Sequence, residues 1–178
     1  VLAGTRGRAG GVGLWYFQER GMPNYGPAYR EYAYFTNGKS NTVWVIGLRA
    51  FQPAATIRVG GDPTGIAANS RKNEIYVVNT ESNSISVIDA ERNEVVATIG
   101  VHAAPYFIDV SADGRRAYVA NSKSPNVPVL DLDRRLVVGT LPVGASPGLA
   151  RVSPHCPAAG VSHGAHTQAS TVDHPRPP

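Results

Sequence analysis

Two residues in one loop of the sequence have side chains that could do chemistry together. His102 stands in the stretch VHAAPYF, where two related stretches, VGGDP and VGASP, have glycine, and Tyr106 follows four residues later. Imidazole titrates near neutral pH, so His102 could bind a ligand or transfer a proton beside the Tyr106 phenol. The alternative, which we prefer, is a surface histidine next to an aromatic residue that packs in the core. Asp62 and Arg58, near the matching loop, are less specific candidates for the same site.

A second group of reactive residues gathers near the C-terminus. The segment contains His155, Cys156, His163, His166 and His174. Cysteine and histidine are suitable zinc ligands, and an HxxH pair could share a metal from one helical turn. The segment, however, has no helical periodicity, no second cysteine and no suitably spaced carboxylate. We therefore predict no metal site and no cofactor, and we expect an incidental thiol in a disordered tail, with chance metal affinity as the alternative.

The sequence lacks the common catalytic signatures. It contains no GxSxG elbow, no HExxH, no P-loop and no GxGxxG following a strand. The stretch VGGDPTG has glycines but lacks the lysine and the spacing that cradle a phosphate. Enzymatic activity is therefore uncertain, and a protein without catalysis is the favoured interpretation.

Composition favours strands and turns. Of 178 residues, 42% are hydrophobic and 17% are charged, with 19 glycines and 14 prolines. The net charge of +4 is scattered in ones and twos, so nucleic-acid binding is not expected. No stretch reaches the length of about 18 apolar residues that spans a bilayer, and VLAGTRGRAGGVG does not resemble a signal peptide. These features predict an all-β protein.

A period of 42 residues organises the middle of the chain. Six sets of residues repeat three times in phase, and this agreement is too extensive for chance. The sets are Tyr34, Tyr76 and Tyr118; Asn37, Asn79 and Asn121; Val45, Val87 and Val129; Thr56, Thr98 and Thr140; Val59, Val101 and Val143; and Pro63, Pro105 and Pro147.

Each repeat contains four short runs with strand character. In the middle repeat these are EIYVVN, SISVID, EVVATIGV and PYFIDVS, separated by the turn formers NTESN, DAERN and ADG. A unit of about 40 residues with four short antiparallel strands is typical of a β-propeller blade. The sequence therefore predicts about three blades.

Some repeated positions have roles that can be read from their residue types. The asparagine represented by Asn79 ends a strand, where its side chain is expected to bond to its own backbone two residues on and shape the hairpin. Asp89 and Asp131 open the next turn, whereas the first repeat has Gly47, which should loosen that blade without abolishing it. Pro128 removes one backbone donor from a strand that should lie inside a blade.

The strings YFTNGKSNTVWVI, YVVNTESNSISVID and YVANSKSPNVPVLDL resemble the YVTN repeats of β-propeller proteins. The resemblance covers residues 33–154. It implies that PTGIAANS, PYFIDVS and PGLARVS are innermost strands around a central channel, followed outward by the Tyr-x-x-Asn, Val-Ile-Asp and outer strands. It also implies a periplasmic or extracellular protein.

The resemblance divides the chain into three segments. Residues 1–32 form an N-terminal segment that could supply a degenerate partial blade, residues 33–154 contain the repeats, and residues 155–178 form the tail. The abrupt loss of the repeat in the tail indicates truncation, fusion or a shifted reading frame, with a purposely evolved tail as the alternative. Closed propellers have typically four to eight blades, so three are incomplete. The strand PGLARVS is expected to have an exposed edge without a following partner. Such an edge favours self-association, two copies making a six-bladed ring, or else an open array.

Two functional interpretations follow. The preferred one is a non-catalytic binding or scaffold module that recognises a protein, polymer or surface through its rim and channel mouth. The alternative, supported by fold analogy alone, is a propeller enzyme similar to lactonases, lyases or haem and quinone oxidoreductases. In both interpretations the channel mouth is the expected ligand site, with His102, Tyr106, Asp62 and Arg58 as its candidate residues.

Overall fold

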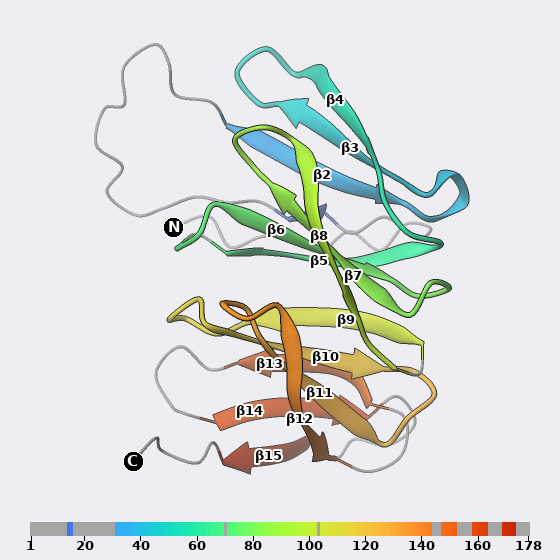
Figure 1. Cartoon of the computed structure of the whole chain (residues 1–178), viewed down its shortest axis with the longest axis vertical. Coiled ribbons are helices and arrows are strands. Elements are labelled where there is room, and N and C mark those ends of the chain that lie inside the picture. Colours follow the sequence, from blue (N-terminus) through green and yellow to red (C-terminus); the bar gives the residue numbers. More distant parts are fainter. Residues whose placement is uncertain are drawn as a thin grey trace.

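The computed structural model describes residues 14–15, 31–69, 71–102, 104–143, 147–152, 158–163 and 169–173, which form four antiparallel sheets (Figure 1). Three sheets have four strands and are called blades 1 to 3; the C-terminal sheet has three. Blade 1 consists of β1 (Leu14–Trp15), β2 (Tyr32–Asn37), β3 (Thr42–Gly47) and β4 (Gln52–Arg58). Blade 2 consists of β5 (Pro63–Asn69), β6 (Glu74–Asn79), β7 (Ser84–Asp89) and β8 (Glu94–Gly100). Blade 3 consists of β9 (Pro105–Val110), β10 (Arg116–Asn121), β11 (Asn126–Asp131) and β12 (Leu136–Pro142), and the C-terminal sheet of β13 (Pro147–Val152), β14 (Ala158–His163) and β15 (Ala169–Asp173).

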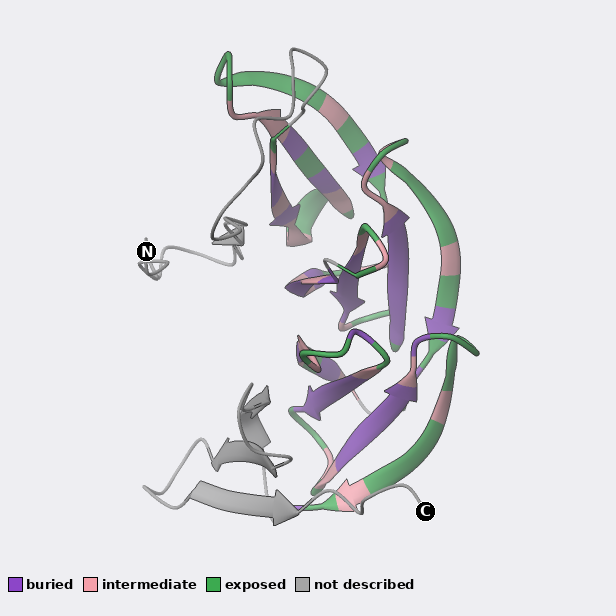
Figure 2. Ribbon diagram, turned by 90° about the vertical axis from the view of Figure 1, so that its left-hand side faces the viewer, coloured by how far each residue is buried: buried purple, intermediate pink, exposed green. Residues whose placement is uncertain are grey.

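Strand order within each blade follows the chain, as the resemblance to YVTN repeats implies. In blade 2 the order is β5-β6-β7-β8, and blade 3 repeats it. Figure 2 shows the blades along an arc, with their exposed outermost strands on its convex side. The all-β class and the propeller blades are therefore confirmed.

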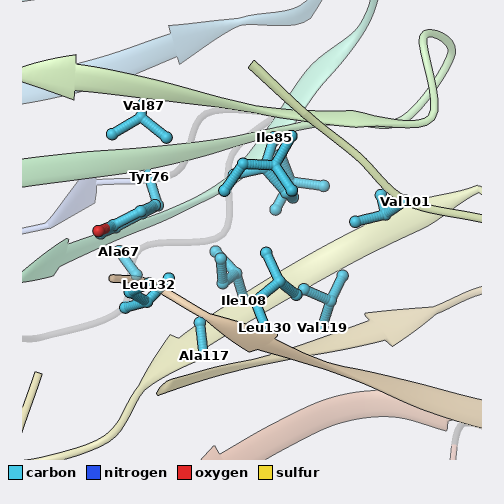
Figure 3. Close-up of a cluster of buried hydrophobic side chains, with 12 residues drawn as sticks. Ala67, Tyr76, Ile85, Val87, Val101, Ile108, Ala117, Val119, Leu130 and Leu132 are labelled. Carbon is cyan, nitrogen blue, oxygen red and sulfur yellow. The ribbon is translucent and has the colours of Figure 1, made fainter. Parts of the chain in front are cut away.

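The hydrophobic core lies between consecutive blades. One face of blade 2, with Tyr76, Ile85 and Val87, packs against blade 3, where Ile108 and Leu130 contribute, and all five side chains are fully buried. Figure 3 shows these two sets of side chains directed toward each other. Blades 1 and 2 form the equivalent cluster. The 42-residue period thus places the same apolar types at each inter-blade contact.

Polar contacts also join the blades. Thr36 in blade 1 donates its hydroxyl hydrogen to the carbonyl oxygen of Thr64 in blade 2 at 3.0 Å. Thr80 in blade 2 donates to the carbonyl oxygen of Pro105 in blade 3 at 2.7 Å. The Tyr34 hydroxyl of blade 1 donates a hydrogen bond to Oδ1 of Asn93, in the turn between β7 and β8 of blade 2, at 2.7 Å. These bonds fix the blades relative to one another.

The turns between the third and fourth strands show why aspartate repeats there. Asp89 Oδ1 accepts hydrogen bonds from the backbone N–H groups of Glu91 and Arg92 at 2.8 and 3.1 Å. Asp131 makes the matching pair of bonds, both 2.9 Å long. Gly47 occupies the same phase of the repeat in blade 1 and has no side chain that could do the same.

The repeated asparagine acts differently from our expectation. The Nδ2 group of Asn79 donates to the hydroxyls of Ser84 and Ser86 on β7, at 3.1 and 2.9 Å, rather than bonding to its own backbone two residues on. The fully buried amide therefore ties the two strands of the hairpin together directly. Its structural role stands, but the predicted local bond is wrong.

At the C-terminal end of the repeat region, the structure differs from expectation in the pairing of β13. The strand β13 is paired along its length with β14, and β14 with β15, so the prediction that it has no following partner in the chain is wrong. His163 ends the strand β14 rather than lying in a helical turn, while His155, Cys156, His166 and His174 lie outside the described residues. In the segment 1–32, Leu14–Trp15 pairs with β2 of blade 1. The segment boundaries themselves stay a prediction.

Candidate functional site

A polar groove of about 860 Å³ runs over one end of the blades. It is formed by the turns between the second and third strands of each blade and by the connections that enter β5 and β9. Its lining consists of Gly38, Lys39, Asn41, Asp62, Thr80, Glu81, Asn83, Ala104, Ser122 and Lys123. The groove therefore takes residues from all three blades, at the end where the sequence places the channel mouth.

The connection entering blade 2 is held on both sides by the neighbouring turns. Asn41 Oδ1 of blade 1 accepts a hydrogen bond from the Asp62 N–H at 3.0 Å. The Thr80 N–H of blade 2 donates to the Asp62 carbonyl at 3.0 Å. Asp62 itself has a φ of 49°, in the left-handed region that few side chains adopt. These bonds offset that conformational cost and keep the groove wall in place.

The connection entering blade 3 repeats this arrangement. Asn83 Oδ1 accepts from the Ala104 N–H at 2.8 Å, and the Ser122 N–H donates to the Ala104 carbonyl at 3.0 Å. Ala104 also has a φ of 49°. In the third repeat Pro125 takes the phase of Asn41 and Asn83, so the side-chain acceptor is lost there. Among the described residues, the connections that enter blades 2 and 3 are therefore held by the same pair of hydrogen bonds.

Charged side chains follow the groove at one phase of the repeat. Lys39, Glu81 and Lys123 are 42 residues apart and all exposed. A Cβ added at Gly38 would lie 2.7 Å from Asp62 Oδ1, so a glycine is needed there for the carboxylate to lie against the turn. With two lysines and two carboxylates, the lining has no net charge, which suits a polar partner better than a strong anion or cation.

The structure places the residues that the sequence suggested for a single site on different elements. Asp62 lines the groove. His102 is exposed in the same connection as Ala104 but is not among the lining residues. Tyr106 lies on the innermost strand of blade 3 and is 51% exposed, whereas Arg58 ends the outermost strand of blade 1. Sequence reasoning missed the lysines and glutamate of the turns, although their shared phase was a usable signal.

The lining of the groove contains no histidine or cysteine side chain. Within the described residues, no three histidine, cysteine, aspartate or glutamate side chains come together as a metal site would require. Burial raises the pKa of Tyr34, Tyr76 and Tyr118, and these phenols do not line the groove. What the groove offers is hydrogen bonding and charge from hydroxyls, amides, amines and carboxylates.

Comparison with known proteins agrees with the geometry of the blades. A model of the YNCE-like beta-propeller family matches residues 21–158. The chain belongs to the YNCE-like beta-propeller family. A sequence search of curated proteins gives no significant match. No helix among the described residues has the length and apolar character that crossing a membrane requires.

Two solved structures illustrate the similarity of this YNCE-like chain to other propellers. A hydrazine synthase structure from Kuenenia stuttgartiensis is 25% identical, with a TM-score of 0.72, and the match covers 79% of this chain and 41% of that chain. The dihydro-heme d1 dehydrogenase NirN is 20% identical, with a TM-score of 0.60, over 78% of this chain and 32% of that chain. The second likeness shows the fold alone. This chain spans less than half the length of either solved chain.

Proposed function

We propose that this YNCE-like chain is a non-catalytic propeller module that binds a polar protein or polymer segment across the groove. The observation that carries the proposal is the groove itself, because three successive blades contribute equivalent turns to one continuous polar surface. The exposed side chains of Lys39, Glu81 and Lys123 are long and flexible, and they stand on the hairpin turns of three successive blades. This arrangement is suited to contacts along an extended partner. Asp62 belongs to this site.

The alternating signs of charge define the partner further. Lysines at both ends and a glutamate between them favour a segment whose own charges or polar groups alternate. His102 and Tyr106 lie outside the lining, on the connection and inner strand of blade 3, where a partner that extends toward the concave side would reach them. Arg58, on the outermost strand, is the least central of the four sequence candidates.

An enzyme is the second candidate, since both solved neighbours carry enzyme names. Under this alternative, His102 would act as an acid or base and Tyr106 as its neighbour at the channel mouth. Neither residue is among those that line the groove, which favours the binding module.

We propose that the ring is completed by self-association and that residues 33–154 act as the propeller unit, flanked by segments 1–32 and 155–178.

The resemblance to YVTN repeats supports a periplasmic or extracellular location. Fractionation of the native cells tests it, and recovery of the protein with cytoplasmic markers would contradict it.

Array binding tests the groove. An array of polysaccharides and of peptides with alternating charge is probed with the labelled wild-type chain. The same array is probed separately with a labelled variant that carries Lys39→Ala, Glu81→Ala and Lys123→Ala. The control variant carries Arg92→Ala and Arg134→Ala, which are exposed in the turns after the third strands. We expect binding that falls at least about tenfold in the groove variant only, equal to a loss of about 1.4 kcal/mol.

Two results would overturn this proposal. One is binding that the groove variant retains in full. The other is turnover of a lactone or similar substrate that His102→Ala abolishes, which would establish the enzymatic alternative.

A further inference from the structure

Two asparagines of the groove lining each hold their side-chain amide in a fixed orientation. Asn41 and Asn83 stand in the turns between the second and third strands of blades 1 and 2, and both are exposed. Each side-chain oxygen accepts a hydrogen bond from a backbone N–H of the next connection, that of Asp62 or that of Ala104. A backbone N–H can only donate, so the atom that faces it is the amide oxygen, and Nδ2 lies on the other side of the amide.

The two Nδ2 groups are therefore donors for a ligand. Among the described residues, no acceptor bonds to either of them. Because the bond to the connection already fixes each amide, little side-chain freedom is lost when a ligand binds. The donors of Asn41 and Asn83 are 42 residues apart and thus recur at the interval of one blade, whereas Pro125 offers no side-chain donor at this phase of blade 3.

The charged groups of the lining follow a definite order along the groove. Lys39 in blade 1 and Lys123 in blade 3 stand at its two ends, and the carboxylates of Asp62 and Glu81 lie between them. A Cβ added at Gly61 would lie 3.0 Å from Glu81 Oε2, so this carboxylate lies against the connection that carries Asp62. Within the described part of the chain, none of these four groups forms an ion pair. A complementary ligand has a positive group between two negative ones.

This order of charges selects the class of polymer. Nucleic acids carry a negative charge at every phosphate and no positive charge. Neutral polysaccharides carry no charge, and acidic ones carry negative charge only. A polypeptide carries both signs on one chain and has a carbonyl acceptor at every residue. It therefore satisfies both the charges and the amide donors of the groove.

The spacing of the blades sets the spacing of the ligand's charges. Packed sheets lie about 10 Å apart, so equivalent turns of neighbouring blades repeat at about that interval. A polyproline II helix rises about 3.1 Å per residue with three residues per turn, so its side chains recur on one face about every 9 Å. Its backbone carbonyls make no internal hydrogen bonds and are free to accept from the groove. In a β-strand, by contrast, residues three positions apart face opposite sides.

We propose that the groove binds a polypeptide segment in the polyproline II conformation that carries a basic residue between two acidic ones, each three positions from the next. The Nδ2 groups of Asn41 and Asn83 donate to its backbone carbonyls. Glu81 pairs with the basic residue, and Lys39 and Lys123 pair with the acidic ones. This inference rests on the proposed function and names the partner of the same site.

Fluorescence anisotropy of labelled peptides, titrated with the full chain, tests the spacing. The first peptide is Asp-Pro-Pro-Arg-Pro-Pro-Asp, and the second has the same composition with its three charged residues adjacent. The third exchanges the signs, with one aspartate between two arginines. We expect the first peptide to bind at least about tenfold more tightly than either of the others, since each of three exposed ion pairs contributes modestly.

Asn41→Asp and Asn83→Asp test the amide donors. Aspartate keeps an oxygen for the N–H of the connection, so the groove wall is retained, but an ionised carboxylate has no hydrogen to donate. The control is Pro125→Asp, which adds the same charge at the same phase of blade 3 without removing a donor. We expect each asparagine variant to bind the first peptide about tenfold more weakly than the control does. Circular dichroism confirms that each variant is folded.

Glu81→Lys tests the central ion pair by exchange of charges. This variant should lose the first peptide and prefer a fourth, in which aspartate replaces the central arginine. Equal affinity of the wild type for the first and second peptides, asparagine variants that match Pro125→Asp, or no change of preference in Glu81→Lys would overturn the inference. If another polymer of the array is then bound by the wild type and lost by the groove variant, the proposed function stands without this partner.

Discussion

At the scale of single residues, the turn of blade 1 between β3 and β4 departs twice from its counterparts. Gly47 stands where Asp89 and Asp131 accept two backbone hydrogen bonds each. A Cβ added at Gly47 would meet only the Gln52 carbonyl oxygen, at 3.7 Å, which is ordinary contact. The site therefore has room for the missing aspartate.

We predict that Gly47→Asp stabilises the protein by about 1 kcal/mol, through the restored turn bonds and the loss of glycine's freedom in the unfolded chain. Urea denaturation measures the change, and Gly47→Asn is the control for an acceptor without charge. An unchanged midpoint for both variants would mean that the first turn cannot adopt the geometry of the other two.

The gain from aspartate should depend on pH. Hydrogen bonds from the Arg134 and Asp133 N–H groups lower the pKa of the Asp131 carboxyl below its usual value, and a new carboxylate at position 47 should behave alike. A carboxyl whose pKa is lower in the folded state stabilises the fold above its unfolded pKa of about 3.9. The advantage over Gly47 should therefore be present at pH 7 and disappear as the pH falls through the folded pKa. Gly47→Asn should show no such loss.

The second departure is Phe51, which is 81% exposed and has a φ of 51°. The same left-handed position is occupied by Asn93 and Arg135 in the later blades, with φ values of 58° and 57°. Asparagine tolerates this conformation better than a bulky residue does. We predict that Phe51→Asn raises the unfolding free energy by about 1 kcal/mol.

Thermal melting checks this prediction, with Phe51→Ala as its matched control. Alanine removes the exposed ring but keeps the strained conformation, so it should give little of the gain. Equal stabilisation by both variants would assign the effect to the exposed ring rather than to the backbone.

At the scale of elements, Pro128 explains why one hairpin differs from the others. In blade 2, β6 and β7 pair through all six residues of each strand, from Glu74 with Asp89 to Asn79 with Ser84. In blade 3, β10 and β11 pair only from Arg116 to Tyr118, and Pro128 pairs with Thr140 of β12 but not with β10. A proline has no N–H to donate to a neighbouring strand.

We predict that Pro128→Ser extends the pairing of β10 and β11 and stabilises the protein by about 1 kcal/mol, the usual net worth of one hydrogen bond. Amide hydrogen exchange gives the sharper test, because the N–H groups of Val119 and Asn121 should become more protected. A lower melting temperature would show that the proline ring, which is buried, contributes more by packing than it removes from the ladder.

The strands were predictable to the extent that they repeat. The 42-residue period located the four strands of each repeat, and their order from innermost to outermost came from the resemblance to YVTN repeats. The side chain of Asn79 was harder to place, since its partners Ser84 and Ser86 lie across the hairpin rather than next in sequence. The strands β14 and β15 fall outside the repeat and lack clear alternation, so only their pairing reveals them.

At the scale of the whole molecule, the blades are held together where their innermost strands come closest. A Cβ added at Gly65 of β5 would lie 2.8 Å from the carbonyl oxygen of Tyr106 and 3.0 Å from the Cα atom of Phe107, both on β9. These are backbone atoms, so they cannot turn aside as a side chain could. The groove depends on this contact, since the connections that form its wall lead directly into β5 and β9.

Gly65→Ala should therefore separate blades 2 and 3 and destabilise the protein by about 1 to 3 kcal/mol, the range for overpacked contacts. Urea denaturation should also become less cooperative, because repeat proteins gain stability from interfaces between neighbours. The control is Gly139→Ala on β12, where an added Cβ meets nothing within 4 Å. If Gly65→Ala costs no more than Gly139→Ala, the innermost strands are not in tight contact. The blades would then depend on the apolar faces of Figure 3 alone.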